Sequence, residues 1–281
     1  MVVTFVIFLR EGIEASMIVA IVLSYLARLD QRRHFRDVYL GVAAALLVVA
    51  VGGVAAYLLV HHYDGSNVQT YFETATYLVA TAALTFMTFW MARHARTMSG
   101  ELQARSELAL STGTRWGVGL LAFQAVGREG LETLVFTLAI VFANCRQAAT
   151  PVHGDLLILG AVLGLAVALA IAVAIYRMGA ALNLRRFFRV LGVLLMFFAA
   201  GLLVDAVQNL QQLGWLPIGR AVLWNSGGTV LESSNLGDVL HSLVGYADRP
   251  TILQAVVWLG YVAASVAVFL RLSRARAVTA P

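Results

Sequence analysis

The chain has 281 residues, of which 60% are hydrophobic and only 12% charged, and its formal net charge is +5. Soluble domains carry about 25% charged residues, so this composition excludes an ordinary soluble domain and indicates an integral membrane protein. The chain contains no lysine, which excludes the lysine-bearing phosphate loop of ATP-hydrolysing proteins.

Apolar runs predict an all-α, polytopic membrane protein with seven transmembrane helices, because about 20 apolar residues cross the hydrocarbon layer. The first and fourth runs contain internal charges and read as spans only if those charges are tolerated. Between the sixth and seventh runs, residues 211–250 are partly irregular, with helical spacing of apolar residues over 236–244 that predicts a short amphipathic helix on the outer surface. The predicted spans are 2–27, 41–60, 74–92, 116–143, 156–176, 190–210 and 251–270.

The positive charges predict the orientation in the membrane. Fifteen of the twenty, all arginines, lie in alternate loops and the tail, within residues 28–36, 93–115, 177–189 and 271–276. Such loops are cytoplasmic by the positive-inside rule, so the N-terminus is predicted outside and the C-terminus in the cytoplasm. Because these clusters alternate with lipid spans, no nucleic acid is expected as a partner.

A charged motif occurs twice within the apolar sequence. Residues 10–14 read REGIE and residues 128–132 read REGLE. Each copy opens a unit of three predicted spans, and because three is odd, the second unit crosses the membrane in the opposite orientation to the first. Inverted repeats are typical of transporters, whose substrate site lies near the membrane midplane at the repeat interface.

The two motifs place four glutamates at one depth. Counted from the outer membrane surface at 1.5 Å per residue, Glu11, Glu14, Glu129 and Glu132 all lie roughly 14–21 Å deep. On each helix the two glutamates are three residues apart and share a face, and the arginine four residues before the second glutamate is spaced to pair with it.

These charges are costly in lipid, which favours a function for them. One charge at a helix centre costs about 2.5–3.5 kcal/mol, and six cost on the order of 15–20 kcal/mol before any pairing. Pairing with Arg10 and Arg128 leaves a net charge of −2, which a divalent cation neutralises and a trivalent one turns into +1. Carboxylate oxygens suit hard cations. We therefore expect a metal site between the two helices, with the arginines orienting the second glutamates, and Gly12 and Gly130 allowing the helices to approach closely. The alternative is a pair of structural salt bridges, but the surplus glutamate in each copy favours the cation site.

The doubled R-E-x-x-E motif resembles the oxidase-dependent iron permease family, which includes the high-affinity iron permease of yeast and the bacterial Efe-type ferrous iron permeases. The resemblance continues in YFET (71–74), LTFMTFWM (84–91), FFAAGL (197–202) and LVGY (243–246), and so covers nearly the whole chain. It implies seven spans, iron uptake, translocation through the motif glutamates, and iron delivery by an extracytoplasmic oxidase or binding protein.

Four further residues are candidates for an outer entrance to the site. Glu73 begins the third span on the outer side, Asp205 lies near the outer end of the sixth, and His61 and His62 lie in an outer loop, where imidazoles bind metals well. His241, on the same side, is expected to be a solvated loop residue.

The sequence thus predicts one permease domain over 1–281, made of repeat one (2–93), repeat two (116–210), an outer amphipathic segment (211–250) and a seventh helix (251–270). Its predicted function is high-affinity inward transport of iron in a bacterial inner membrane. No enzymatic activity and no organic cofactor are expected. Transport of another divalent cation, such as manganese or lead, and a non-transporting membrane scaffold or sensor remain the alternatives.

Overall fold

Seven long α-helices make up most of the computed structural model, which describes residues 1–62, 66–94, 117–147, 154–178, 184–226 and 235–274, apart from some side chains near the ends of these ranges. Each long helix matches one predicted span, with two of the helices beginning one residue later than predicted, so the prediction of an all-α polytopic protein is confirmed. Within these ranges the strand-like pairing is limited to one bridge between Val222 and Thr251. The long helices are α1 (Val2–Arg28), α2 (Phe35–His62), α3 (Asn67–His94), α5 (Gly117–Gln147), α6 (Gly154–Met178), α7 (Leu184–Gln212) and α9 (Ile252–Arg274), and the short ones are η1 (Arg32–His34) and α8 (Asn235–Val244).

Five of the long helices are long and apolar enough to cross a membrane. α1 and α5 carry the charged motifs and do not qualify on composition, so they depend on their neighbours to keep charged side chains out of lipid. In α1 this shielding is complete, because Arg10, Glu11 and Glu14 are all buried. The five qualifying segments are Arg32–Leu58, Asn67–Met91, Asp155–Ala174, Val190–Gln212 and Ile252–Phe269.

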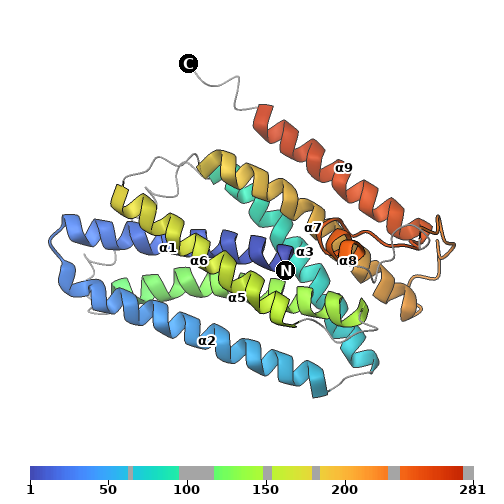
Figure 1. The fold of residues 1–281 in the computed structure, drawn as a ribbon, viewed down its shortest axis with the longest axis horizontal. Helices are drawn as coiled ribbons and strands as arrows, with labels where there is room; N and C mark the ends of the chain where they lie inside the picture. Colours follow the sequence, from blue (N-terminus) through green and yellow to red (C-terminus); the bar gives the residue numbers. More distant parts are fainter. Residues whose placement is uncertain (63–65, 95–116, 148–153, 179–183, 227–234, 275–281) are drawn as a thin grey trace.

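The helices pack in pairs around the motif-bearing helices (Figure 1). α1 lies along α6 and α5, α5 lies along α2, and α3 lies along α7, which also contacts α8 and α9. Large apolar side chains on α2 and α6, such as Leu47 and Ile158, are 65% exposed, as expected for surfaces that face lipid.

The largest buried apolar cluster lies on one side of the motifs. Its α1 members precede Arg10 and its α5 members follow Glu132, and side chains of α3 and α7 complete it. The motif glutamates are therefore separated from one end of the helix bundle by closely packed apolar side chains. The α1 and α5 members are Val3, Val6, Ile7, Phe136, Ala139, Ile140 and Phe142.

The expectation that the motif glycines bring α1 and α5 together is wrong. A Cβ added to Gly12 would lie 2.8 Å from the Cβ of Ala168 in α6, and one added to Gly130 would lie 2.6 Å from Cγ2 of Val49 in α2. Gly12 thus allows α1 to approach α6, and Gly130 allows α5 to approach α2. Both helices run through their glycine without interruption.

The predicted amphipathic helix in the segment 211–250 is present as α8, and it packs onto α7. Its end is fixed by Gly245, whose φ of +72° favours glycine, and a Cβ there would lie 2.5 Å from Cα of Gly201. The indole Nε1 of Trp258 in α9 donates to the Val244 carbonyl oxygen at 2.6 Å. These contacts hold α8 over the end of the bundle at which α1 begins and α5 ends.

Candidate metal centre

Arg10 holds both glutamates of α1. Its Nη1 donates to Glu11 Oε1 at 3.0 Å, its Nε lies 3.2 Å from Glu14 Oε1, and its Nη2 donates to Met91 Sδ at 3.8 Å. The three charged side chains are at most 4% exposed. The predicted pairing of Arg10 with Glu14 is confirmed, and the contacts with Glu11 and with the buried Met91 of α3 come in addition.

The second copy of the motif is more open. Arg128 Nε donates to Glu132 Oε1 at 3.1 Å, which confirms the predicted pair, and lies 4.0 Å from Glu129 Oε1. The Arg128 side chain is 49% exposed, and its guanidinium carbon lies 5.5 Å from the ring centroid of Trp90, at cation–π distance. The two arginines therefore differ, since Arg10 is buried and contacts two carboxylates whereas Arg128 is half exposed and has one short carboxylate contact.

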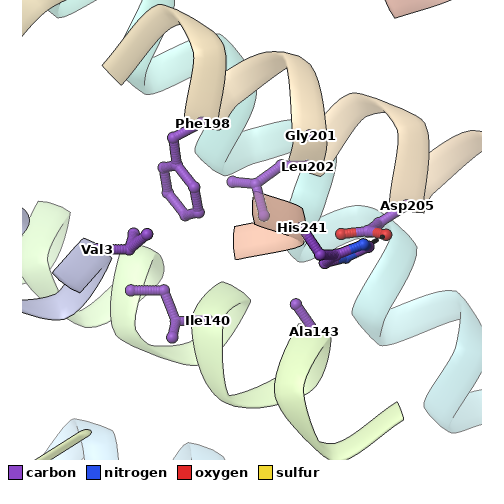
Figure 2. Close-up of a pocket in the computed structure, with 8 residues that line it drawn as sticks. All are labelled: Val3, Ile140, Ala143, Phe198, Gly201, Leu202, Asp205 and His241. Atoms are coloured by element: carbon purple, nitrogen blue, oxygen red, sulfur yellow. Dashed lines mark ion pairs between the residues drawn. The ribbon is translucent and has the colours of Figure 1, made fainter. Parts of the chain in front are cut away.

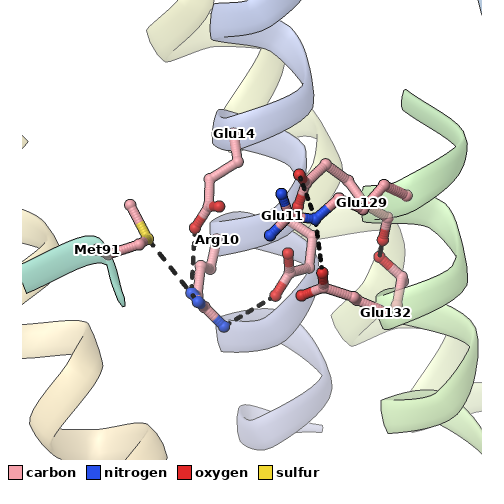
Figure 3. Close-up of polar contacts among 8 residues, drawn as sticks. Arg10, Glu11, Glu14, Met91, Glu129 and Glu132 are labelled. Carbon is pink, nitrogen blue, oxygen red and sulfur yellow. Dashed lines mark hydrogen bonds and ion pairs between the residues drawn. The ribbon is translucent and has the colours of Figure 1, made fainter. Parts of the chain in front are cut away.

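Carboxylates from the two helices meet at one level between α1 and α5. One oxygen from each of Glu11, Glu14 and Glu129 lies within 4.8 Å of the others, and all three residues are buried. Figure 3 shows these side chains, with Glu132 beside them, gathered between the two helices. Glu132 is not in the closest group, and its carboxylate is bonded to Arg128. The structure thus brings three of the four predicted ligands into one cluster and leaves the fourth at its edge.

Each glutamate also has one buried oxygen that accepts no hydrogen bond from the described part of the chain. Glu14 Oε1 keeps its ionic contact with Arg10, but burial of such oxygens without hydrogen bonds is costly. Carboxylate oxygens are the ligands that hard divalent cations prefer, so the residues present fit a metal ion. The four atoms are Glu11 Oε2, Glu14 Oε1, Glu129 Oε2 and Glu132 Oε2.

The residues predicted to form an outer entrance have different surroundings. Glu73 is buried in the second turn of α3 and accepts a hydrogen bond from Gln69 Nε2 at 2.9 Å. Asp205 is buried on α7, with Oδ1 3.5 Å from Nε2 of His241. The side chains of His61 and His62, at the end of α2, lie outside the described residues.

The prediction that His241 is a solvated loop residue is wrong, because it is only 6% exposed. It lies in α8, and its ring is held between Asp205 of α7 and the carbonyl oxygen of Tyr246. One signal was present in the sequence. His241 falls inside the apolar helical pattern of residues 236–244, which indicated a helix and not a loop at this position.

Comparison with known proteins identifies the family. The sequence pattern of the iron permease FTR1 family matches residues 1–277. The ferrous iron permease EfeU of Escherichia coli O6:H1 is 30% identical over 283 residues, covering 99% of this chain and 98% of that protein. The ferrous iron permease EfeU of Yersinia pestis is 32% identical over 275 residues, with coverage of 96% and 93%. No solved structure matches the chain.

The resemblance seen in the sequence is therefore confirmed over nearly the full length. Members of this family are permeases and not enzymes, and the apolar helices agree with an integral membrane protein. The chain belongs to the iron permease FTR1 family.

Proposed function

We propose that the protein moves iron inward through a site formed by Glu11, Glu14, Glu129 and Glu132. The observation that carries this proposal is the set of four buried carboxylate oxygens, one from each glutamate, that accept no hydrogen bond from the described residues. Four carboxylates and two arginines have a formal charge of −2, which a divalent ion balances. The relatives are named as ferrous iron permeases, and iron(II) has the charge that this site requires.

The two arginines position the glutamates and limit the negative charge that the ion meets. Arg10 binds one oxygen of Glu11 and the nearer oxygen of Glu14, and Arg128 binds one oxygen of Glu132. Partial neutralisation of the glutamates by the arginines lowers the affinity of the site for the ion. A moderate affinity suits transport, since a transport site must release its substrate as well as bind it. The arginines therefore act through the glutamates and do not themselves contact iron.

The chain is organised as two inverted repeats (2–93 and 116–210), an outer segment (211–250) and a seventh helix (251–270), in a bacterial inner membrane. Its N-terminus is outside and its C-terminus is in the cytoplasm. The packing supports the repeats, because α1 lies along α6 and α5 lies along α2, so that the first helix of each repeat contacts the second helix of the other. Gly12 and Gly130, which occupy the same position in the two motifs, lie at these two equivalent contacts.

Transport follows alternating access between the repeats. In this orientation the large apolar cluster lies between the glutamates and the outside, so an ion cannot reach them until α1 and α5 move relative to α3 and α7. The half-exposed guanidinium of Arg128 would cost at least about 2.5 kcal/mol in contact with lipid. Its exposed side therefore faces water that is continuous with the cytoplasm. An extracytoplasmic oxidase or iron-delivery protein, implied by the family resemblance, completes the proposal as the donor of iron.

Uptake of radiolabelled iron into proteoliposomes tests this function. We expect Glu11→Gln and Glu129→Gln to abolish uptake, and Asp30→Asn, at an exposed residue after α1, to transport as the wild type does. Competition by manganese in the same assay measures how strongly a site made only of carboxylate oxygens selects iron over manganese. Normal iron uptake by folded Glu11→Gln protein would refute the proposed site.

A further inference from the structure

A small cavity lies away from the motif glutamates, under α8 (Figure 2). It lies between the start of α1, the end of α5, the middle of α7 and the short helix α8. Two of its lining residues are ionisable, and both point into it, Asp205 from α7 and His241 from α8. The other lining residues are Val3, Ile140, Ala143, Phe198, Gly201 and Leu202. An ionisable pair in so apolar a cavity requires an explanation.

The hydrogen bonding of His241 determines which nitrogen faces the cavity. Its Nδ1 lies 2.7 Å from the carbonyl oxygen of Tyr246, and because a carbonyl only accepts, Nδ1 carries a proton and donates it. In the neutral ring, Nε2 is then an unprotonated acceptor. Nε2 faces Oδ1 of Asp205, which is also an acceptor. Two acceptors that face each other in an apolar cavity can hold a cation between them, and that cation is either a proton or a metal ion.

The separation of the two atoms is closer to that of two ligands of one metal ion than to that of a charge-assisted hydrogen bond. Charge-assisted hydrogen bonds between nitrogen and carboxylate measure about 2.7–2.9 Å. Bonds of about 2.1 Å from one ion to both atoms would place those atoms about 3.0–3.4 Å apart, depending on the coordination geometry. The observed distance of 3.5 Å lies just above the range for two ligands of one ion and well above the range for such a hydrogen bond. A backbone carbonyl that fixes the histidine tautomer, with Nε2 directed at the site, is also the usual arrangement behind a metal-binding imidazole.

We propose that Asp205 and His241 form an outer binding site for a divalent transition-metal ion, which passes from there to the glutamates. This inference rests on the proposed function for the transport step, but the binding itself does not. Val3, which lines the cavity, and Glu11 are eight residues apart on α1, a rise of about 12 Å. The outer site therefore lies on the far side of the apolar cluster from the glutamates.

The mixed ligands of the outer site give it a role that the glutamates do not have. Four carboxylates are suitable ligands for Mg²⁺ and Ca²⁺ as well as for iron. An imidazole nitrogen favours iron and its transition-metal neighbours over these hard ions. The outer site would therefore select the metal before it reaches the oxygen-only site. Two protein ligands leave the remaining positions to water, so binding is weak enough for the ion to move on.

Binding of Co²⁺ to purified protein in lipid nanodiscs, measured by equilibrium dialysis with millimolar Mg²⁺ present, tests the proposal. The starting protein carries Glu11→Gln and Glu129→Gln, which disable the central site, so that remaining binding reports the outer site. We expect this protein to bind one Co²⁺ ion per chain despite the Mg²⁺. Adding Asp205→Asn or His241→Gln should weaken that binding at least ten-fold. Asp155→Asn, at an exposed residue in the first turn of α6 on the same side, should leave it unchanged.

The outcomes separate the two proposals. No bound Co²⁺ in the starting protein would overturn the outer site, as would unchanged affinity after either Asp205→Asn or His241→Gln. In that case the pair would be a structural ion pair between α7 and α8, and the thermal stability of the variants would fall to the same extent with and without Co²⁺. Equal Co²⁺ binding by the wild type and the starting protein in a second dialysis without Mg²⁺ would instead contradict the central glutamate site and leave the outer site supported.

Discussion

Replacement of each motif arginine by lysine tests the different surroundings of the two copies. In Arg10, separate guanidinium nitrogens lie 3.0 Å from Glu11 and 3.2 Å from Glu14, whereas a lysine ammonium is a single point charge. At least one buried carboxylate then loses its partner. A hydrogen bond to a charged group contributes about 1.5–3 kcal/mol, so Arg10→Lys should misplace a glutamate at roughly that cost.

Arg128 should tolerate the same change better. It has one carboxylate contact at 3.1 Å and is half exposed, and a lysine can keep one such contact. Exposed ion pairs contribute about 0.2–1 kcal/mol, and 1 kcal/mol corresponds to a factor of about five in an equilibrium. The prediction is therefore a loss of iron uptake of ten-fold or more for Arg10→Lys and of less than about five-fold for Arg128→Lys.

The assay is the initial rate of radiolabelled iron uptake into proteoliposomes, normalised to folded protein by size-exclusion chromatography and thermal unfolding. Arg33→Lys, at an exposed residue of η1, serves as the matched control. Wild-type rates in Arg10→Lys would refute the positioning role of this guanidinium. A larger loss in Arg128→Lys than in Arg10→Lys would contradict the asymmetry of the two sites.

Three further substitutions test the packing around the site. Gly12→Ala places a Cβ 2.8 Å from that of Ala168. The substitution should lower the unfolding free energy by about 1–3 kcal/mol, measured by thermal unfolding. It should also displace α1 and so reduce iron uptake, measured in the transport assay. Gly245→Ala combines a φ of +72° with a close backbone contact, and it should loosen α8, which amide hydrogen exchange in residues 235–244 would report. Trp90→Leu removes the ring beside Arg128, a contact of about 0.5–1 kcal/mol at an exposed site, and should change uptake by less than about five-fold.

The long helices were predictable because their signal is local. A run of about 20 apolar residues specifies a long apolar helix whatever its neighbours are, and the repeated motif predicted α1 and α5 as helices despite their charges. The common level of Glu11, Glu14 and Glu129 followed from counting helical rise along two antiparallel segments. The Arg10–Glu14 and Arg128–Glu132 pairs followed from their spacing of four residues within one helix.

What could not be predicted depends on contacts between distant segments. A glycine at position 12 indicates that another helix can approach α1 closely there. It does not indicate whether that helix is α6 or α5. His241 carries no signal in its own segment for Asp205, which lies 36 residues earlier on another helix. The unequal exposure of Arg10 and Arg128 arises from the different neighbours of two nearly identical motifs, so the motifs alone could not reveal it.

We propose that iron binds between α1 and α5 on its way through the protein. Anomalous diffraction from crystals soaked with iron(II) under anaerobic conditions tests it most directly. We expect an iron peak within bonding distance of Glu11 or Glu14 from α1 and of Glu129 from α5. A fully occupied iron peak bound elsewhere, with these carboxylates free of metal, would contradict it.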